Sequence, residues 1–262
     1  MILPVYDIQE SKWKDVGTHL SSYVKLDGGD QIVMGMRVKD FKTDMCLVCV
    51  SASGMIKRTL IRDLEVTRLN KTYTVMNLKG KDTLVAAFVA HPTSTMIVLS
   101  RGGYGVNLTA DQVSIQAPKS QGVKAINLKE KDFVACACSA SSDQEAVVIA
   151  TEKGSSKRIK AGDISLKSRP VMGELIAKRV QSNPNVVKSV QSGSLHDIIR
   201  FYDQRIEEYL LKDIPLMSLD QTYSNSVSLQ GEMIQPCIDV EVLIHEDDHD
   251  NEKVERISLE LE

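Results

Sequence analysis

One phrase occurs twice in this chain of 262 residues, 50 positions apart. Residues 73–82 read YTVMNLKGKD and residues 123–132 read VKAINLKEKD, so Asn-Leu-Lys and a closing Lys-Asp recur at the same places. A fixed period of about 20 to 50 residues is typical of folds that stack one supersecondary unit many times. This repeat constrains the fold more strongly than the composition does.

Two independent markers keep the period along the chain. An aspartate followed closely by an aliphatic residue recurs at Asp7, Asp63, Asp111, Asp163 and Asp213, and the last four are 48, 52 and 50 residues apart. The aliphatic residue within the repeated phrase recurs at Leu26, Leu78, Leu128, Val180 and Leu229, at spacings of 49 to 52. Chance is a poor explanation for two markers with one period.

Ahead of each later aspartate, two short apolar runs flank a turn, which predicts a β-hairpin. The four hairpins are expected at 46–60, 96–110, 146–160 and 198–212. Gly54, Gly103 and Gly154 stand at the first three turns, where a positive φ is needed. A loop, a third strand such as 123–128 and a fourth such as 133–140 follow, and no segment sustains a helical period.

Four strands per repeat predict an all-β, propeller-like fold of about four full blades. We expect a partial blade at 1–43, then blades at about 44–94, 95–144, 145–195 and 196–243, and an acidic tail at 244–262. Tandem β-sandwiches are the alternative, but they need about 100 residues per unit. Strands that complete the partial blade are expected from residues preceding Met1 in a longer protein, or from residues 254–262; the former is favoured.

The net charge of −3 hides an asymmetry between body and tail. Residues 239–262 hold ten acidic and two basic side chains, leaving 30 basic and 25 acidic residues in the remainder, a net charge of +5. A mildly basic body with an acidic tail suits binding of a polyanion. The tail is expected to be a solvated segment or a competitor for the basic surface, and a metal site at His245 and His249 is a weaker alternative.

The five cysteines and the apolar runs exclude other classes of protein. An odd number of cysteines argues against a disulfide framework. Cys46 and Cys49 are expected on opposite faces of one strand and Cys136 and Cys138 on one face, which favours buried thiols over metal ligands. The longest apolar run, residues 84–90, is too short to span a bilayer, so no integral membrane segment is expected.

The amino-acid sequences of the hairpins resemble those of a known family. Residues 53–64 (SGMIKRTLIRDL) and 153–164 (KGSSKRIKAGDI) resemble blade hairpins of the C-terminal β-pinwheel of bacterial type IIA topoisomerase A subunits, and residues 121–134 resemble the following half-blade. Residues 2–26, including Trp13-Lys14-Asp15, are similar to the topoisomerase IV branch of Gram-positive bacteria. The Gln-Arg-Arg-Gly-Gly-Lys-Gly box of gyrase A subunits has no match, but gyrase stays open because the first blade is incomplete.

Other propellers fit less well. A single tryptophan excludes the WD-repeat class, and 15 glycines are few for an RCC1-type interaction propeller. A propeller enzyme would need acids or histidines converging on a central channel, whereas the five histidines do not recur at one repeat position.

The resemblance implies a non-catalytic domain that binds and bends duplex DNA, presenting the transported segment for strand passage, decatenation and relaxation of supercoils. For the parent protein it implies an N-terminal breakage-reunion domain, a heterotetramer with the ATPase partner of topoisomerase IV (ParE), and a requirement for ATP and Mg²⁺. It also implies a place in the bacterial cytoplasm with the nucleoid, or peripherally at the cell membrane. No catalytic residue, metal or cofactor is expected in this domain.

Holding a curved duplex without sequence preference requires Lys and Arg along a rim, where they neutralise phosphates. The candidates are Lys57, Arg58, Arg68, Lys71, Arg101, Lys119, Lys124, Lys157, Arg158, Lys160, Lys167, Arg169, Lys178 and Arg179. Lys57-Arg58 and Lys157-Arg158 are the strongest, because they occupy equivalent repeat positions, with one residue of each pair facing outward. Reversing the charges of Lys157 and Arg158 is expected to weaken duplex binding and flatten its salt dependence.

The last repeat departs from this basic pattern. Residues 195–235 hold three basic and seven acidic side chains, and Glu207-Glu208 stand where other repeats have Lys-Arg. DNA is therefore not expected to follow this part of the rim.

Overall fold

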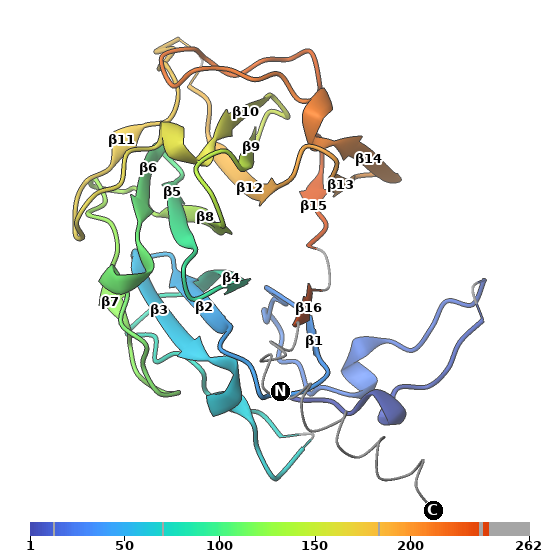
Figure 1. The fold of residues 1–262 in the computed structure, drawn as a ribbon. Helices are drawn as coiled ribbons and strands as arrows, with labels where there is room; N and C mark the ends of the chain where they lie inside the picture. The colour runs from blue at the N-terminus through green and yellow to red at the C-terminus, as the bar shows by residue number, and fades with distance from the viewer. Residues whose placement is uncertain (13, 70, 183, 236–237, 241–262) are drawn as a thin grey trace, which may run out of the picture.

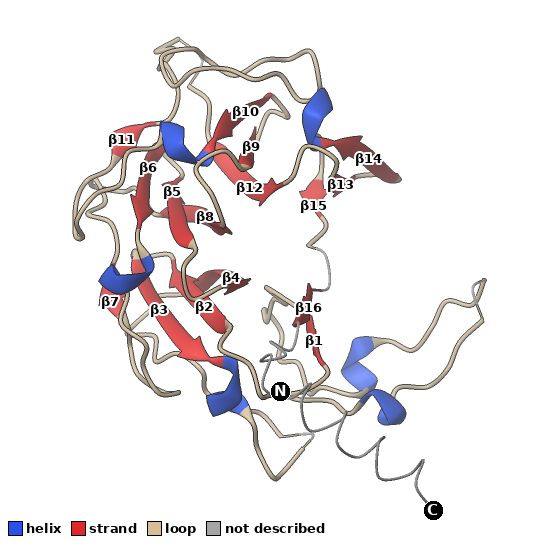
Figure 2. Cartoon of the chain, viewed as in Figure 1, coloured by secondary structure: helices blue, strands red, loops and turns tan. Residues whose placement is uncertain are grey.

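The computed structural model describes residues 1–12, 14–69, 71–182, 184–235 and 238–240. Trp13, Cys237 and the acidic tail with His245, His249 and residues 254–262 lie outside the described residues. Short strands and single 3₁₀ turns make up the described elements (Figure 2), so the all-β prediction is confirmed. In this part of the chain no helix is long and apolar enough to cross a membrane.

All four predicted hairpins are present. Each turn is followed by a strand that runs into a 3₁₀ turn of three or four residues. Gly54, Gly103 and Gly154 have φ of 88°, 81° and 80°, as their turns require. The hairpins are β2 (Cys46–Ser51) with β3 (Met55–Leu60), β5 (Thr95–Ser100) with β6 (Tyr104–Leu108), β9 (Ala146–Thr151) with β10 (Ser156–Lys160), and β13 (Ile198–Tyr202) with β14 (Ile206–Leu210).

The 3₁₀ turns after the hairpins are η3 (Ile61–Leu64), η4 (Ala110–Gln112), η5 (Ala161–Asp163) and η6 (Leu211–Asp213). These turns correct the position of the aspartate marker in the second repeat. Gln112 closes η4 where Asp163 and Asp213 close η5 and η6, so the residue equivalent to those aspartates in the second repeat is Gln112, and Asp111 lies one position earlier.

An inner strand lies antiparallel to the first strand of each hairpin and faces the centre of the ring (Figure 1). These strands follow the repeated phrase or its equivalent, as the four-strand pattern predicts. They are β4 (Leu84–Ala90) on β2, β8 (Val134–Ala140) on β5, β12 (Val187–Gly193) on β9 and β15 (Glu232–Met233) on β13.

In the first two hairpin sheets, the outer strand comes from the following repeat. β7 (Val123–Lys124) pairs with β3 and β11 (Glu174–Leu175) pairs with β6, giving the sheet orders β4-β2-β3-β7 and β8-β5-β6-β11. The expectation of contiguous blades at about 44–94 and 95–144 is therefore wrong at this strand, because neighbouring blades interlock. The exchange covers the edge that the second hairpin strand would otherwise leave unpaired.

A parallel pair brings together the first and last strands of the described chain. β1 (Met36–Val38) lies beside β16 (Ile238–Val240), and Arg37 forms an ion pair with Asp239 at 2.7 Å. This pair lies between β15 and the sheet of β2 (Figure 1). Residues 238–240 supply a partner for β1; the expected contribution of residues preceding Met1 stays a prediction, and residues 254–262 lie outside the described residues. The segment ahead of β1 carries η1 (Val5–Asp7) and η2 (Leu20–Ser22).

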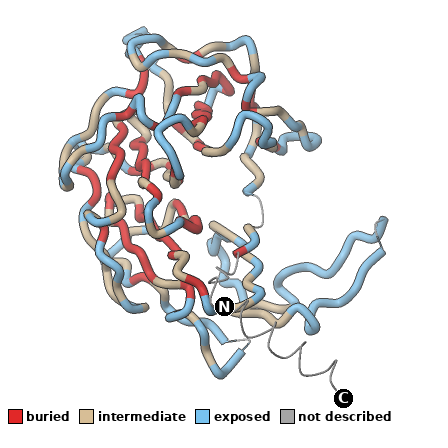
Figure 3. The backbone as a smooth tube through the Cα atoms, viewed as in Figure 1, coloured by how far each residue is buried: buried red, intermediate tan, exposed pale blue. Residues whose placement is uncertain are grey.

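The apolar core lies between neighbouring sheets rather than inside one sheet. All residues of β2 and of β9 are buried, because a neighbouring sheet covers each face (Figure 3). One cluster joins the first and second hairpin sheets through Val48, Val98 and Val106. Another cluster joins the second and third sheets through Ile97, Ile149 and Ile159. Each blade thus depends on the next for its core.

The described cysteines are buried free thiols, as expected from their strand positions. Cys136 and Cys138 lie in one apolar cluster, while Cys49 packs in a different cluster with Leu47. Burial raises the pKa of the Cys49 thiol to about 11 and that of Cys138 to about 12. These thiols are therefore protonated and unreactive near neutral pH.

Candidate nucleic-acid interface

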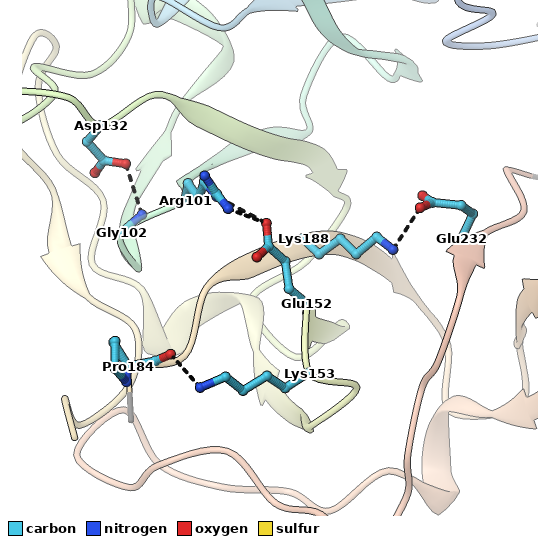
Figure 4. A network of polar contacts seen from close by, with 8 residues as sticks. All are labelled: Arg101, Gly102, Asp132, Glu152, Lys153, Pro184, Lys188 and Glu232. Atoms are coloured by element: carbon cyan, nitrogen blue, oxygen red, sulfur yellow. Dashed lines mark hydrogen bonds and ion pairs between the residues drawn. The ribbon is translucent and has the colours of Figure 1, made fainter. Parts of the chain in front are cut away.

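The repeated phrase forms a turn that caps the adjacent hairpin. The Asp82 N–H donates to the Lys79 carbonyl at 3.1 Å, and the Asp132 N–H donates to Lys129 at 3.0 Å. Each aspartate then accepts a backbone hydrogen bond of 2.9 Å from its own hairpin turn, Asp82 from Ser53 and Asp132 from Gly102 (Figure 4). The repeated aspartate within the phrase thus has a structural cause.

The charge on Asp82 is stabilised in this turn. Burial alone would raise the pKa of its carboxyl, but hydrogen bonds from Ser51, Ser53 and Thr83 outweigh burial and lower the pKa below its ordinary value. The carboxylate is therefore ionised at any pH at which the protein would meet nucleic acid.

Lys57 and Lys157 are buried, with 1% and 0% of their surface exposed. Lys157 Nζ donates to the carbonyls of Ile176, Ser218 and Gln221 at 2.9, 2.8 and 3.1 Å. The prediction that Lys157 contacts phosphate is wrong, because its ammonium is enclosed and its three N–H groups already have acceptors.

Lys57 makes equivalent contacts in the first hairpin, one hundred residues earlier. We call a buried lysine that bonds to the next repeat in this way a joint. Its Nζ donates to the carbonyls of Val75 and Ala117 at 2.6 and 2.7 Å, 18 and 60 residues ahead, while Lys157 reaches Ile176 and Ser218, 19 and 61 ahead. The phosphate prediction is wrong for Lys57 for the same reason. Equivalent lysines thus tie a hairpin to its own connection and to the next repeat.

Burial has an electrostatic cost at both lysines. It lowers the pKa of Lys157 to about 8, a shift that Asp220 and Asp163 partly oppose. Burial also lowers the pKa of Lys57. Lys157 Nζ lies 5.7 Å from the centre of the Tyr223 ring, which offers the cation a further favourable contact.

The next residue along each strand also bonds to the following repeat. Arg58 Nε donates to the Val113 carbonyl at 2.6 Å and Arg158 Nε to Ile214 at 3.0 Å. Asn107 takes the equivalent place in the second hairpin, where its Nδ2 lies 3.3 Å from the carbonyls of Ala161 and Ile164. Arg58 is 7% exposed and Arg158 is partly exposed, and the phosphate contacts of both stay predictions.

Six predicted phosphate contacts lie on the connections and outer strands between blades. We call them the rim bases: Lys119, Lys124, Lys167, Arg169, Lys178 and Arg179. Lys119 and Lys124 lie on the connection that ends in β7 and crosses β3, and Lys167 and Arg169 lie on the equivalent connection across β6. Lys178 and Arg179 lie three and four residues after the end of β11.

The rim bases differ in how strongly the protein holds them. Lys119, Lys124 and Lys178 are exposed, and within the described residues no carboxylate lies within ion-pair distance of them. Lys167 lies 3.8 Å from Glu174, and Arg169 Nε donates to the Gln112 carbonyl. These contacts leave the first three ammonium groups as the most available to a phosphate.

Four predicted residues lie away from the rim bases. Arg68 and Lys71 are exposed on the long connection after η3. Lys160 is exposed and donates to Gln144 at 2.8 Å. Arg101 lies 2.6 Å from Glu152, so its charge is already paired (Figure 4).

Sequence reasoning missed a basic group around Tyr104. Lys129 Nζ and the Arg179 guanidinium lie 4.6 and 4.9 Å from the centre of its ring, and Arg179 also donates to Gly102 at 3.0 Å. Lys79, Lys81, Lys129 and Lys131 are exposed in the two capping turns. The repeated phrase itself contained these lysines and was the signal for them.

The last hairpin presents paired acids instead of buried bases. Glu207 lies 2.9 Å from Arg205, and Glu208 lies 2.6 Å from Arg200. Hydrogen bonds from Tyr209 and Arg205 lower the pKa of Glu207. This part of the rim therefore carries no surplus of positive charge.

The ring encloses a central cavity of about 1260 Å³, lined mainly by β4, β8 and β12. Lys188 on β12 pairs with Glu232 on β15 at 2.8 Å across one side of it (Figure 4). In the described part of the chain, no three His, Cys, Asp or Glu side chains lie close enough together to hold a metal ion.

Comparison with known proteins finds a family whose matched segments follow the repeat. The family described as "DNA gyrase C-terminal domain, beta-propeller" matches residues 2–38, 47–91, 95–135 and 145–173. The A subunit of DNA topoisomerase 4 from Bacillus subtilis (strain 168) is 28% identical over 222 residues, which are 85% of this chain and 27% of that protein. This chain thus spans about a quarter of the length of such relatives.

Two solved structures share the fold. The C-terminal domain of DNA topoisomerase IV is 25% identical with a TM-score of 0.78, over 86% of this chain and 70% of that one. The DNA gyrase A C-terminal domain is 22% identical with a TM-score of 0.70, over 88% of this chain and 75% of that one. Because the family match covers more than half of the chain, this protein belongs to the DNA gyrase C-terminal domain, β-propeller family.

Proposed function

We propose that this domain binds duplex DNA along the rim bases and bends it. The observation that carries the proposal is the placement of exposed Lys and Arg on successive connections between blades, where they follow the curved outer side of the ring. Ammonium groups spaced along a curved surface neutralise phosphates without reading sequence, and affinity then comes from counterion release. Family membership supports this function.

The parent protein is proposed to be the A subunit of a topoisomerase IV. Relatives named as A subunits of DNA topoisomerase 4, at 26% to 28% identity, support this over the gyrase alternative, since the likeness to the gyrase domain shows the fold alone. Cleavage and ATP hydrolysis then belong to a breakage-reunion domain and to the separate ATPase partner, with ATP and Mg²⁺. DNA binding would place the protein with the nucleoid in the bacterial cytoplasm.

Charge reversal on the rim tests the DNA proposal. The double variant Lys124→Glu with Lys178→Glu is expected to bind a 40-base-pair duplex about tenfold more weakly at about 100 mM salt, with a salt slope lower by about 2, because two phosphate contacts are lost. Fluorescence anisotropy across a salt series measures both quantities.

A matched control uses Lys212→Glu, which reverses an exposed lysine in the acidic last repeat. It is expected to leave both quantities unchanged. If Lys124→Glu with Lys178→Glu retains the affinity and salt slope of the wild-type chain, the rim bases do not form the DNA interface.

A further inference from the structure

Three aliphatic side chains are exposed at one position of the repeat. Ile115, Leu166 and Leu216 have 47%, 52% and 53% of their surface exposed and are 51 and 50 residues apart. Scattered exposed leucines are common, but an exposed aliphatic at the same place in three successive repeats needs a cause.

The backbone holds all three residues in the same way. Each forms a parallel bridge to the second hairpin strand of the preceding repeat, and the next residue donates a backbone hydrogen bond to the strand residue opposite. The bond lengths are 2.9 Å from Gln116 to Arg58, 3.1 Å from Lys167 to Asn107 and 2.9 Å from Met217 to Arg158. The exposed side chains therefore stand on fixed, repeated supports.

The repeat distinguishes these exposed positions from the core. Two residues earlier, Val113, Ile164 and Ile214 are at most 1% exposed, so each connection directs one aliphatic side chain inward and the next outward. The outward side chain lies on the same connection as rim bases in two of the three cases. Lys119 follows Ile115 by four residues, and Lys167 and Arg169 follow Leu166 by one and three.

We propose that Ile115 and Leu166 enter the minor groove of the bound duplex, one per blade, and set the bend of the DNA. The inference rests on the proposed function. Bases that follow an aliphatic tip on the same connection suit a partner in which phosphates border a less polar groove, and architectural proteins use Leu and Ile in this way. Leu216 has the same support, but Leu219 and Asp220 follow it in place of bases, so it does not hold DNA.

The test separates apolar contact from charge. In Ile115→Ser with Leu166→Ser, duplex affinity is expected to fall about tenfold, since two half-exposed aliphatic side chains lose their contact, while the salt slope stays that of the wild-type chain. Energy transfer between dyes at the two ends of a 40-base-pair duplex is expected to show a smaller bend. Ile115→Met with Leu166→Met keeps the apolar bulk and should retain both affinity and bend.

Leu216→Ser is the matched control, because it removes an equally exposed leucine on an equivalent connection, and it is expected to change affinity less than twofold. A wild-type chain without salt-dependent DNA binding would refute the proposed function itself. Wild-type binding that the Ile115→Ser, Leu166→Ser variant reproduces in affinity and bend would refute only the groove contact. A flattened salt slope in that variant would also overturn it, because the loss would then be one of charge.

Discussion

The hairpins β2–β3 and β9–β10 differ from the hairpin β13–β14 at one equivalent position. Strand register places Lys57 opposite Cys49, Lys157 opposite Ile149 and Glu207 opposite Phe201. The two lysines are buried against carbonyls of the next repeat, whereas Glu207 is partly exposed and pairs with Arg205.

The difference shows what the Lys-Arg pair does. A buried ammonium needs acceptors, and the following repeat supplies them to the first and third hairpins. In the described residues, no further repeat follows the last hairpin, so a lysine there would lack the carbonyls that the next repeat supplies to Lys57 and Lys157. The Lys-Arg pair therefore marks a joint between blades, and the proposed DNA contacts lie at exposed bases on the connections.

The largest expected effect comes from removing the joint. Lys157→Met should lower the free energy of unfolding by about 3 kcal/mol, because three buried carbonyls lose their donor. Urea unfolding followed by circular dichroism measures it. Lys160→Met, which removes an exposed lysine of the same strand, should cost under about 0.5 kcal/mol. Equal losses in the two variants would mean that Lys157 is not a joint.

The pH dependence of stability tests the burial of Lys157 in a second way. Burial lowers the pKa of Lys157 to about 8, so between that value and its ordinary 10.5 the unfolded chain holds a proton that the folded chain has released. Stability contributed by this group therefore rises with pH across that window and is level below it. The difference in unfolding free energy between wild type and Lys157→Met should grow from pH 8 to 10.5. A constant difference would contradict the lowered pKa.

A smaller effect is expected at the capping turn. Asp132→Ala removes the acceptor for the Gly102 N–H and should lower stability by about 1 kcal/mol, as loss of a capping carboxylate does. Asp132→Asn keeps an acceptor oxygen and should recover more than half of the loss. Thermal melts of both variants compare them, and a recovery of less than half would show that the hydrogen bond is not the cause.

The smallest effect is expected in the last hairpin, β13–β14. Glu207→Lys with Glu208→Arg restores the Lys-Arg pair in the last hairpin but provides no carbonyls of a following repeat for it, so the unfolding free energy should change by less than about 0.5 kcal/mol. Urea unfolding of this variant beside the wild-type chain measures the change. A stabilisation of about 2 kcal/mol or more, roughly the net value of a charged hydrogen bond, would mean that the wording alone forms a joint.

The sequence predicted the elements that short-range chemistry determines. Positive φ at Gly54 and Gly154 and the apolar runs on either side fixed the hairpins, because turn geometry and alternation act over a few residues. Lys119 and Lys178, predicted as phosphate contacts from their charge, are exposed, and the contacts themselves stay predictions. Long-range choices were not found: the sequence does not state which edge a two-residue strand such as Val123–Lys124 will cover.

What the sequence by itself determined is the period, the hairpins, the buried thiols and the surplus of basic residues. Tertiary structure alone decided that Lys57 and Lys157 point into the joint, that Ile115 and Leu166 point outward, and that residues 238–240 close the ring. The physical reason is that a strand gives its side chains two faces, and only the packing of the neighbouring blade decides which of these faces is buried.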